Sequence, residues 1–434
     1  MKAGRSVRLF EAAPRLGGVI RTEQVDGWLI EAGPNSLQEN SVELSSLIEE
    51  LGLRPEKRLA LPGARNRYIL RHGKPCAAPL SPPALLTSPL FSFGGKLRIL
   101  GDLLCRPRTR IEDLSLADFA RDHFGQEFVN YALNPFVSGV YAGNIEKLSA
   151  RHSFPSLWES ERTHGSIIRA QIAAAKAKRA RGERTGAPPI VSFRTGLEAL
   201  PQALGSRLPR GSVELEARVE GLIPGPTWRV IWSRDGTTQT EEFTSVVLAL
   251  PSAALAEISV GTLGERPLAA VEAIDYPPVS SLFLGYRRAQ IAHPLDGFGL
   301  LVPSVEQRAV LGILFSSSLF EGRAPEGHVA ITVMAGGVNR PDLGRLAISE
   351  LLPKVREELA GMLGVTGDPV FMRHNAWPRA IPQYNLGYER HLEVMARCER
   401  DYPGLLIGGQ ARDGIALTAC IAAGRKLATR VGAP

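Results

Sequence analysis

The amino-acid sequence predicts an α/β fold of the doubly wound, Rossmann-like type, and three stretches of the 434-residue chain indicate it. The first is "SVRLFEA", an apolar run that ends in Glu11, as is typical of a buried parallel strand. The second is "SVVLALP", residues 245–251, another buried strand. The third is a strand over residues 404–407, followed by a glycine-rich turn and a helix over about 415–431. Together these stretches predict a parallel sheet with helices on its faces.

Composition is that of a soluble globular protein. Hydrophobic residues make up 44% and charged residues 22%, which excludes disordered and fibrous classes. A chain of 434 residues is long enough for two or three domains. No window holds the roughly 20 consecutive apolar residues of a membrane-spanning helix, and the N-terminus has no apolar signal region. We expect a cytoplasmic protein, or one attached peripherally to the cytoplasmic side of a membrane.

Cysteine and histidine patterns predict neither disulfides nor a metal site. The four cysteines form no C-x-x-C pair, and the eight histidines form no pair at ligand spacing. The net charge of +7 favours an anionic partner, such as nucleic acid, acidic lipid or a polycarboxylate. The densest basic run, residues 169–186, predicts an alanine-rich helix that ends in a basic loop. It has no aromatic residues on which bases could stack, so we expect no nucleic-acid partner.

The segment after Glu11 indicates a nucleotide site. In a Rossmann unit, an acid at this strand end accepts hydrogen bonds from the ribose hydroxyls of adenosine. The paired glycines Gly17 and Gly18 then form a tight loop that a ligand can approach closely. A second strand, "GWLIEAGP", leads back to a Gly-Pro turn.

The first half of the nucleotide motif is missing from this pattern. A G-x-G-x-x-G turn is expected about 20 residues before the acid, yet only ten residues precede Glu11. The helix start that would bind a pyrophosphate is therefore expected to be absent. Two explanations stay open: a misassigned start codon or a truncated gene.

Several motifs resemble one enzyme family. The run "EAAPRLGGVIRTEQVDGWLIEAGPNSL" matches the second half of the FAD-binding signature of the flavin amine oxidase and phytoene desaturase superfamily. Residues 134–169, "NPFVSGVYAGNIEKLSARHSFPSLWESERTHGSIIR", and the segment "HNAWPRAIPQYNLGY" resemble the protoporphyrinogen oxidases. With "GFGLLVP" and "DGIALTACIAAG", the resemblance extends from Arg5 to the C-terminus.

The resemblance implies FAD as the cofactor. It implies that one group of residues contacts the adenosine, a second group contacts the flavin ring, and the start of the last helix lies under the pyrimidine ring. Without the resemblance, the strand–helix pair at the C-terminus is an ordinary βα unit and Trp377 a core aromatic. The cofactor-binding residues that it implies are Glu11, Arg15, Gly18, Ile20, Gly33, Pro34, Asn35, Ser36, Val219, Trp377, Ile415, Ala416 and Leu417.

The resemblance also implies three substrate-binding residues. Arg67 would pair with a propionate, for which the planar guanidinium is suited. Leu301 and Phe320 would lie against the macrocycle. From local sequence alone, a surface arginine is the simpler interpretation of Arg67, and core packing explains Leu301 and Phe320 as well as substrate contact does. No side chain is expected to act as a catalytic acid or base.

The implied activity is the oxidation of protoporphyrinogen IX to protoporphyrin IX in haem biosynthesis. Flavin removes hydride in three two-electron steps, and oxygen is the electron acceptor, giving hydrogen peroxide. Two alternatives stay open. One is oxidation of coproporphyrinogen III to coproporphyrin III, and the other is a truncated, non-catalytic remnant that cannot hold FAD.

The expected architecture has three parts. A discontinuous, N-terminally truncated FAD-binding domain comprises residues 1–62, 193–251 and 395–434. A mixed α+β substrate domain comprises residues 63–77 and 252–394. Residues 78–192 form a helical, membrane-facing domain, in which the proline-broken apolar helices of 78–108 would lie in the membrane interface or pack as a lid over the substrate. The sequence does not determine the oligomeric state, and a homodimer stays open.

Overall fold

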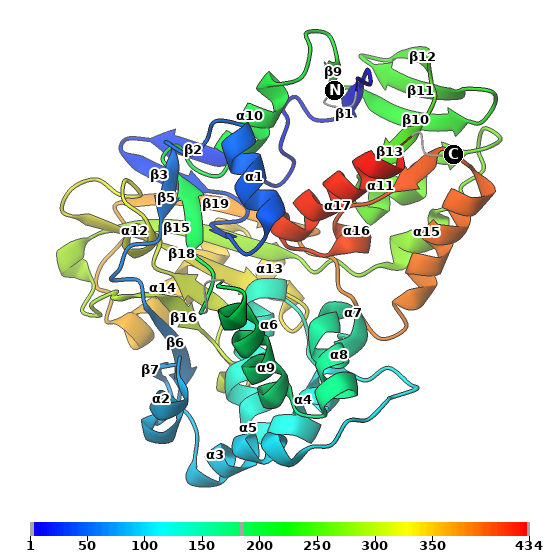
Figure 1. Cartoon of the computed structure of the whole chain (residues 1–434). Helices are drawn as coiled ribbons and strands as arrows, with labels where there is room; N and C mark the ends of the chain where they lie inside the picture. Colours follow the sequence, from blue (N-terminus) through cyan, green and yellow to red (C-terminus); the bar gives the residue numbers. More distant parts are fainter. Residues whose placement is uncertain (1–3, 183–185, 432–434) are drawn as a thin grey trace.

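A computed structural model describes residues 4–182 and 186–431. The chain forms three regions (Figure 1). Short strands from both ends of the sequence meet near the two termini, a larger mixed sheet lies beside them, and helices from residues 82–180 form the third region.

The region near the two termini contains two pairs of parallel strands. In the first, β1 (Leu9–Glu11) pairs with β9 (Val213–Leu215), with Leu9 opposite Val213. In the second, β13 (Val246–Leu248) pairs with β20 (Leu405–Ile407). A four-stranded sheet flanks them, in the order β12 (Thr237–Phe243), β11 (Trp228–Arg234), β10 (Arg218–Ile223) and β14 (Ser259–Val260).

Helices α1 (Val42–Glu50) and α17 (Leu417–Arg430) pack against each other, although they lie at opposite ends of the sequence (Figure 1). Helix α1 begins at the N-cap Ser41, whose hydroxyl accepts a hydrogen bond from the Leu44 N–H. Under them lies an apolar cluster built around Leu44, Ile48 and Phe193. A three-stranded sheet completes this layer, formed by β4 (Leu37–Gln38), β8 (Ile190–Phe193) and β5 (Lys57–Leu59).

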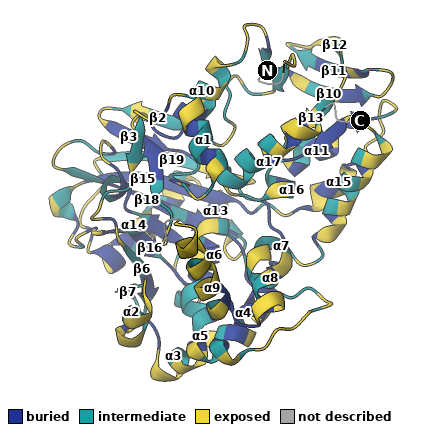
Figure 2. Cartoon of the chain, viewed as in Figure 1, coloured by how far each residue is buried: buried dark blue, intermediate teal, exposed yellow. Residues whose placement is uncertain are grey.

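The second region is a seven-stranded mixed sheet. Its longest strands, β15 (Val279–Arg287) and β18 (His328–Gly336), pair antiparallel along their whole length. Helix α14 (Ile348–Leu363) packs its buried residues against this sheet, and Figure 2 shows the central strands as buried. The remaining strands of the sheet are β19 (Phe371–Trp377), β17 (Gly312–Leu314), β16 (Gly297–Leu301), β6 (Asn66–Arg71) and β7 (Lys74–Ala77).

The third region is helical. Within the described ranges, no helix has the length and apolar character needed to cross a membrane. The principal helices of this third region are α2 (Pro82–Thr87), α3 (Phe93–Leu100), α4 (Leu116–Phe124), α6 (Asn134–Tyr141), α8 (Pro155–His164) and α9 (Ile167–Ala180). A 3-10 turn, η1 (Gly101–Leu104), follows α3.

The predicted elements are confirmed at these positions: the strand ending in Glu11, the strand within residues 245–251, the C-terminal strand and helix, and the short helices of 78–108. The boundaries of the three predicted domains stay a prediction.

Candidate cofactor and substrate site

Arg15 shapes the glycine loop of the predicted cofactor site. Its guanidinium donates hydrogen bonds to the carbonyl oxygens of Leu16 and Ile20, both at 3.0 Å, and of Gly18 at 2.5 Å. Gly17 and Gly18 have φ values of +108° and +55°, which glycine adopts without strain. In the structure, Arg15 therefore holds the backbone of the loop, and its predicted contact with adenosine stays a prediction.

The turn at Gly33 packs directly against this loop. A Cβ atom at Gly33 would lie 2.1 Å from the Val19 carbonyl oxygen, so only glycine fits. The Asn35 side-chain amide donates to the Gly33 carbonyl at 3.0 Å. The Trp377 indole N–H, which comes from β19, donates to the Ala32 carbonyl at 2.9 Å. The structure thus brings the predicted residues Gly18, Gly33, Asn35 and Trp377 into one site, together with the intervening Pro34 and the adjacent Ser36.

A buried ion pair lies at the end of the strand that precedes this turn, and the sequence analysis did not predict it. Glu31 ends β3 (Trp28–Glu31), and its carboxylate accepts hydrogen bonds from the Thr22 hydroxyl at 2.7 Å and the Leu197 N–H at 2.8 Å. Arg323, from the far side of the sequence, donates to it at 3.2 Å. Both side chains are 4% exposed. The available signal was an acid inside the apolar run "WLIE".

Burial dominates the titration of this pair. It raises the pKa of the Glu31 carboxyl, although Arg323 and the hydrogen bonds from Thr22 and Leu197 act to lower it. Burial also lowers the pKa of the Arg323 guanidinium, and Glu31 acts in the opposite direction. Burial therefore disfavours the charged form of each residue, and the opposite charge of its partner favours it.

Helix α17 presents a free N-terminus to the same site. Ala416, its N-cap, has no side chain that could accept from the first amides. Leu417 and Ile20 pack against the same apolar cluster. Ile415 packs against the neighbouring cluster around β20. Unpaired N–H groups and the positive end of the helix dipole favour an electron-rich ring edge there.

The predicted adenosine residues Glu11 and Val219 line one cavity of about 990 Å³. The cavity lies between β1, β10 and β13, at the size range of small-molecule pockets. The Glu11 carboxylate already accepts the Ala13 N–H at 2.8 Å and keeps its remaining acceptor capacity.

The residues present fit FAD at two places. At the flavin end, the Gly33 turn packs closely against the glycine loop, and the uncapped α17 offers N–H groups. At the adenosine end, a carboxylate and a cavity stand where a ribose is expected. That these residues contact FAD stays a prediction.

Two of the three predicted substrate residues share an aromatic neighbour. Arg67, on β6, holds its guanidinium carbon 5.2 Å from the centre of the Phe298 ring. Phe298 packs against a small cluster that contains Phe320, which is only 3% exposed. Phe320 is thus a core side chain here, and its contact with a substrate stays a prediction.

Leu301 lies where the helical region meets the mixed sheet. A Cβ atom on Gly139 of α6 would come within 2.4 Å of its side chain, so glycine allows α6 to approach β16. On the same strand, Gly299 is opposite Arg67 and Leu301 opposite Ile69. Arg67 and Leu301 therefore belong to one pair of strands beneath α6.

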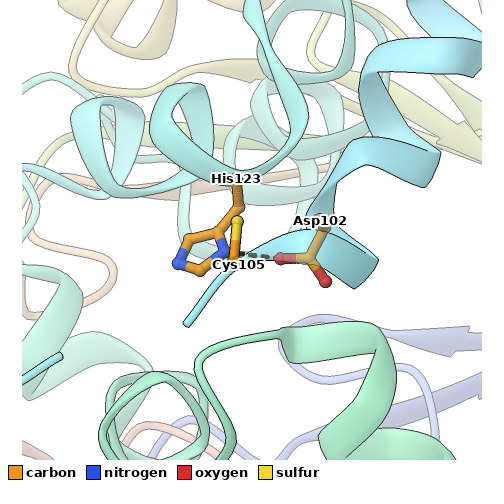
Figure 3. A group of neighbouring side chains, drawn as sticks. All are labelled: Asp102, Cys105 and His123. Atoms are coloured by element: carbon orange, nitrogen blue, oxygen red, sulfur yellow. Dashed lines mark hydrogen bonds and ion pairs between the residues drawn. The ribbon is translucent and has the colours of Figure 1, made fainter. Parts of the chain in front are cut away.

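A second buried polar group lies inside the helical region (Figure 3). The His123 Nδ1 atom is 2.6 Å from a carboxylate oxygen of Asp102, and Cys105 lies beside them. The other Asp102 oxygen accepts the Ser166 hydroxyl at 2.7 Å and the Ile168 N–H at 2.9 Å. These three side chains could hold a metal ion, but both Asp102 oxygens already have partners, so we interpret the group as a link between helices.

Sequence reasoning could not find this group because its members come from separate segments. Its spacing matches no metal motif. Glu161 extends it: a carboxylate oxygen lies 3.3 Å from His123 Nε2, and Arg110 donates to the carboxylate at 2.7 and 2.8 Å. A second group that could hold a metal consists of Asp113, His152 and Glu389.

Comparisons with known proteins identify the family of the chain. The family model for flavin containing amine oxidoreductase matches residues 1–432. The chain is 33% identical to protoporphyrinogen oxidase 2, chloroplastic/mitochondrial, of Arabidopsis thaliana over 99% of this chain and 89% of that protein. It is 26% identical to coproporphyrinogen III oxidase of Bacillus subtilis (strain 168), over 96% of this chain and 89% of that protein.

A solved structure gives the same fold. The crystal structure of a protein from Exiguobacterium sp. 255-15, assigned provisionally as a protoporphyrinogen oxidase, matches with a TM-score of 0.79 at 22% identity. The match covers 97% of this chain and 92% of that chain. At this identity the likeness concerns the fold, which is that of FAD-dependent oxidoreductases.

Proposed function

Because the chain belongs to the family of flavin-containing amine oxidoreductases, we propose that it oxidises protoporphyrinogen IX to protoporphyrin IX, with oxygen as the electron acceptor. The observation that carries the proposal is similarity along nearly the whole chain to protoporphyrinogen oxidases, at 33% identity to the Arabidopsis protein. The relative that acts on coproporphyrinogen III is more distant, at 26% identity. The enzyme is an FAD-dependent oxidoreductase of haem biosynthesis.

In this proposal, residues of the chain position the cofactor and stabilise the charge that develops on it. FAD, when bound, supplies the acceptor for the hydride that leaves the substrate. The Trp377 and Asn35 side chains hold the turn at Ala32 and Gly33, and the missing Cβ of Gly33 lets this turn pack against the glycine loop that would contact the flavin. The first N–H groups of α17 would stabilise negative charge on the pyrimidine edge.

The substrate needs an apolar wall and a cation for its propionates. Arg67 is half-buried, rests on Phe298 and has no ion-pair partner among the described residues. Its guanidinium is therefore free to form a bidentate pair with a propionate. Leu301, on the neighbouring strand, supplies apolar surface.

The test measures porphyrin fluorescence when the purified chain is mixed with protoporphyrinogen IX or coproporphyrinogen III in air. We expect the protoporphyrinogen to be oxidised faster, with visible absorption that shows bound flavin. Faster oxidation of coproporphyrinogen III would replace the proposal with that activity. A colourless, inactive chain under all conditions would support a remnant that cannot hold FAD.

Variants of Arg67 test the propionate contact. Arg67→Met should raise KM roughly tenfold or more, equivalent to about 1.4 kcal/mol of lost binding, with little change in kcat. Arg65→Met is the matched control, because Arg65 is an exposed arginine just ahead of the same strand. Equal kinetics for both variants would remove Arg67 from the substrate site.

We also propose that the enzyme lies peripherally on the cytoplasmic side of a membrane. Large apolar side chains are exposed along α2, α3 and η1 and in the adjoining loop, and these elements lie together at one end of the molecule (Figure 1). Such a concentration on a soluble surface favours contact with lipid or another apolar surface. The exposed residues are Leu80 (62%), Leu86 (60%), Phe93 (77%), Leu97 (54%), Leu100 (38%) and Leu104 (84%).

Sedimentation with anionic phospholipid vesicles tests this surface. The chain should sediment with the vesicles, and Phe93→Glu combined with Leu97→Glu should abolish it. Leu59→Glu is the control, since Leu59 is 59% exposed on β5, outside this surface. Binding that survives the double substitution contradicts the proposal.

A homodimer stays a prediction. Analytical ultracentrifugation without vesicles would report whether the chain forms one.

A further inference from the structure

The side chains of Asp113, His152 and Glu389 come together from three distant segments of the chain. One potential ligand atom of each lies within 4.8 Å of the other two. Asp113 lies in the loop before α4, and His152 lies in the short helix α7 (Ala150–Ser153). Glu389 is the first residue of α15 (Glu389–Asp401) (Figure 1). The three residues therefore meet where the helical region contacts the C-terminal part of the chain.

Two polar atoms of this group are buried without a hydrogen bond. The Asp113 Oδ2 atom and the His152 Nε2 atom are shielded from solvent, and neither has a hydrogen-bond partner. Most buried polar atoms in folded proteins do have one, and an exception commonly faces an ion or an ordered water molecule. The two atoms therefore indicate a ligand that the side chains themselves do not provide.

The charges of the group are unbalanced as well. The Glu389 Oε2 atom lies 3.4 Å from His152 Nε2. Neither Asp113 nor Glu389 forms an ion pair with a lysine or arginine among the described residues. A neutral imidazole and two ionised carboxylates carry two negative charges, which one divalent cation balances. The side chains of His152 and Glu389 are 15% and 54% exposed, so a cation can reach the group from solvent past Glu389.

The backbone holds the three segments together without a ligand. One oxygen of the Asp113 carboxylate, Oδ1, accepts hydrogen bonds from the Leu114 N–H at 2.9 Å and the Arg151 N–H at 3.3 Å. These bonds fix the carboxylate and leave Oδ2 available. The Ser149 N–H, at the start of α7, donates to the Tyr384 carbonyl at 2.8 Å, just ahead of α15. A metal ion would therefore meet ligands that are already positioned, which lowers the entropy cost of binding.

We propose that Asp113, His152 and Glu389 bind one zinc ion, with a water molecule as the fourth ligand. Zinc accepts imidazole nitrogen and carboxylate oxygen, and sites with three protein ligands leave the fourth tetrahedral position to water. Two ligand atoms of one tetrahedral zinc lie about 3.3 Å apart, close to the 3.4 Å between His152 and Glu389. Magnesium and calcium prefer oxygen ligands, so the imidazole favours zinc over both.

The zinc ion would fix a segment that extends from the helical region toward the predicted flavin end. Tyr388 directly precedes the third ligand, and its hydroxyl donates to the Ala411 carbonyl at 2.6 Å. The Tyr384 hydroxyl donates to the Gln410 carbonyl. Both acceptors belong to α16 (Gln410–Asp413), the short helix before α17. The role of the zinc is thus structural, and it does not depend on porphyrinogen oxidation.

Isothermal titration calorimetry with zinc tests the site in the whole chain, purified without a histidine tag and treated with EDTA. We expect one zinc ion per chain and no measurable binding of magnesium. Asp113→Asn, His152→Gln and Glu389→Gln should each weaken zinc binding by roughly 10–100-fold or more, because even the outer partners of metal ligands contribute that much. Glu112→Gln is the matched control and should bind zinc normally, since Glu112 is an exposed carboxylate directly before Asp113.

Thermal unfolding separates a lost ligand from a misfolded variant. Glu389 is half-exposed, so Glu389→Gln should unfold at the same temperature as the unaltered chain when both are free of zinc. Added zinc should raise the midpoint of the unaltered chain, because it binds the folded state, and should raise the midpoint of the variant much less. An equal rise in both chains would overturn the proposal.

X-ray absorption at the zinc edge distinguishes this site from the group around Asp102. The spectrum should show only nitrogen and oxygen ligands, at about 2.0–2.2 Å. A sulfur ligand at about 2.3 Å would place the ion at Cys105 and overturn the assignment. So would unchanged zinc affinity in all three variants. A chain that binds no zinc would also overturn it, and would leave His152 as a protonated partner of two carboxylates.

Discussion

At the scale of single residues, the site depends on positions where a side chain would collide with backbone. Gly33 is the clearest, because its missing Cβ leaves room for the Val19 carbonyl oxygen. Trp377 then fixes the turn through Ala32. The absence of a side chain at Gly33 thus allows the turn and the glycine loop to touch.

Replacing Gly33 with alanine should therefore separate the turn from the glycine loop. We expect a loss of roughly 1–3 kcal/mol in the free energy of unfolding, measured with urea, because the added methyl overlaps backbone that cannot move freely. Bound flavin, read from visible absorption, should fall in parallel. Gly63→Ala is the control, since a Cβ there meets no atom within 4 Å. Equal stability of both variants would contradict the close approach.

At the scale of elements, the helical region is joined by the polar group of Asp102, His123 and Glu161. The Asp102 carboxylate has 0% exposure and connects η1 with α4 and with the start of α9. Burial acts to raise its pKa, but hydrogen bonds from His123, Ile168 and Ser166 outweigh burial and hold the pKa below its usual value. The helices are thus held together by an ionised carboxylate.

A lowered pKa ties stability to pH in one direction. The ionised Asp102 stabilises the fold above its unfolded pKa of about 3.9, and this contribution disappears as pH falls through the lower folded value. Asp102→Asn should cost roughly 1.5–3 kcal/mol of unfolding free energy at neutral pH, and this difference should shrink below about pH 4. Asp235→Asn, at an exposed turn, is the control. Chemical denaturation across pH measures both, and a cost independent of pH would refute the role of the charge.

At the scale of the whole molecule, the Glu31–Arg323 pair joins the strand that leads into the Gly33 turn to a loop beside the mixed sheet. The two residues are 292 positions apart. Arg323 also donates to the Ser192 hydroxyl on β8 at 2.6 Å, so three segments meet at one guanidinium. The relative placement of the two regions therefore depends on one buried charge pair.

Removing the guanidinium should expose the cost of the remaining carboxylate. Arg323→Met should lower the unfolding free energy by roughly 3–5 kcal/mol at neutral pH, because Glu31 is left buried and unpaired. The raised pKa of Glu31 would rise further, and a raised pKa contributes stability that is lost as pH increases through it. The deficit should hence be smaller at about pH 5 than at about pH 8.

The matched control is Arg340→Met. Arg340 forms an exposed ion pair with Asp342, and its loss should change stability by no more than about 0.5 kcal/mol. A deficit in Arg323→Met that grows toward acid pH would show that Glu31 is not the source of the cost.

The sequence by itself determined the fold class, the family and the local elements of the cofactor site. A run of apolar residues predicts a strand such as the one ending in Glu11. A glycine such as Gly33 marks a position where other residues do not fit, so both features can be recognised from the local sequence.

Only the tertiary structure decided which distant residues meet. Asp102 and His123, or Glu31 and Arg323, share no motif, because a buried polar group is satisfied by whichever segments the packing brings together. Likewise, Phe320 proved to be a core side chain, and residues of β1 and β13 proved to line one cavity. Contacts of this kind arise from strand order and packing, which local sequence patterns do not encode.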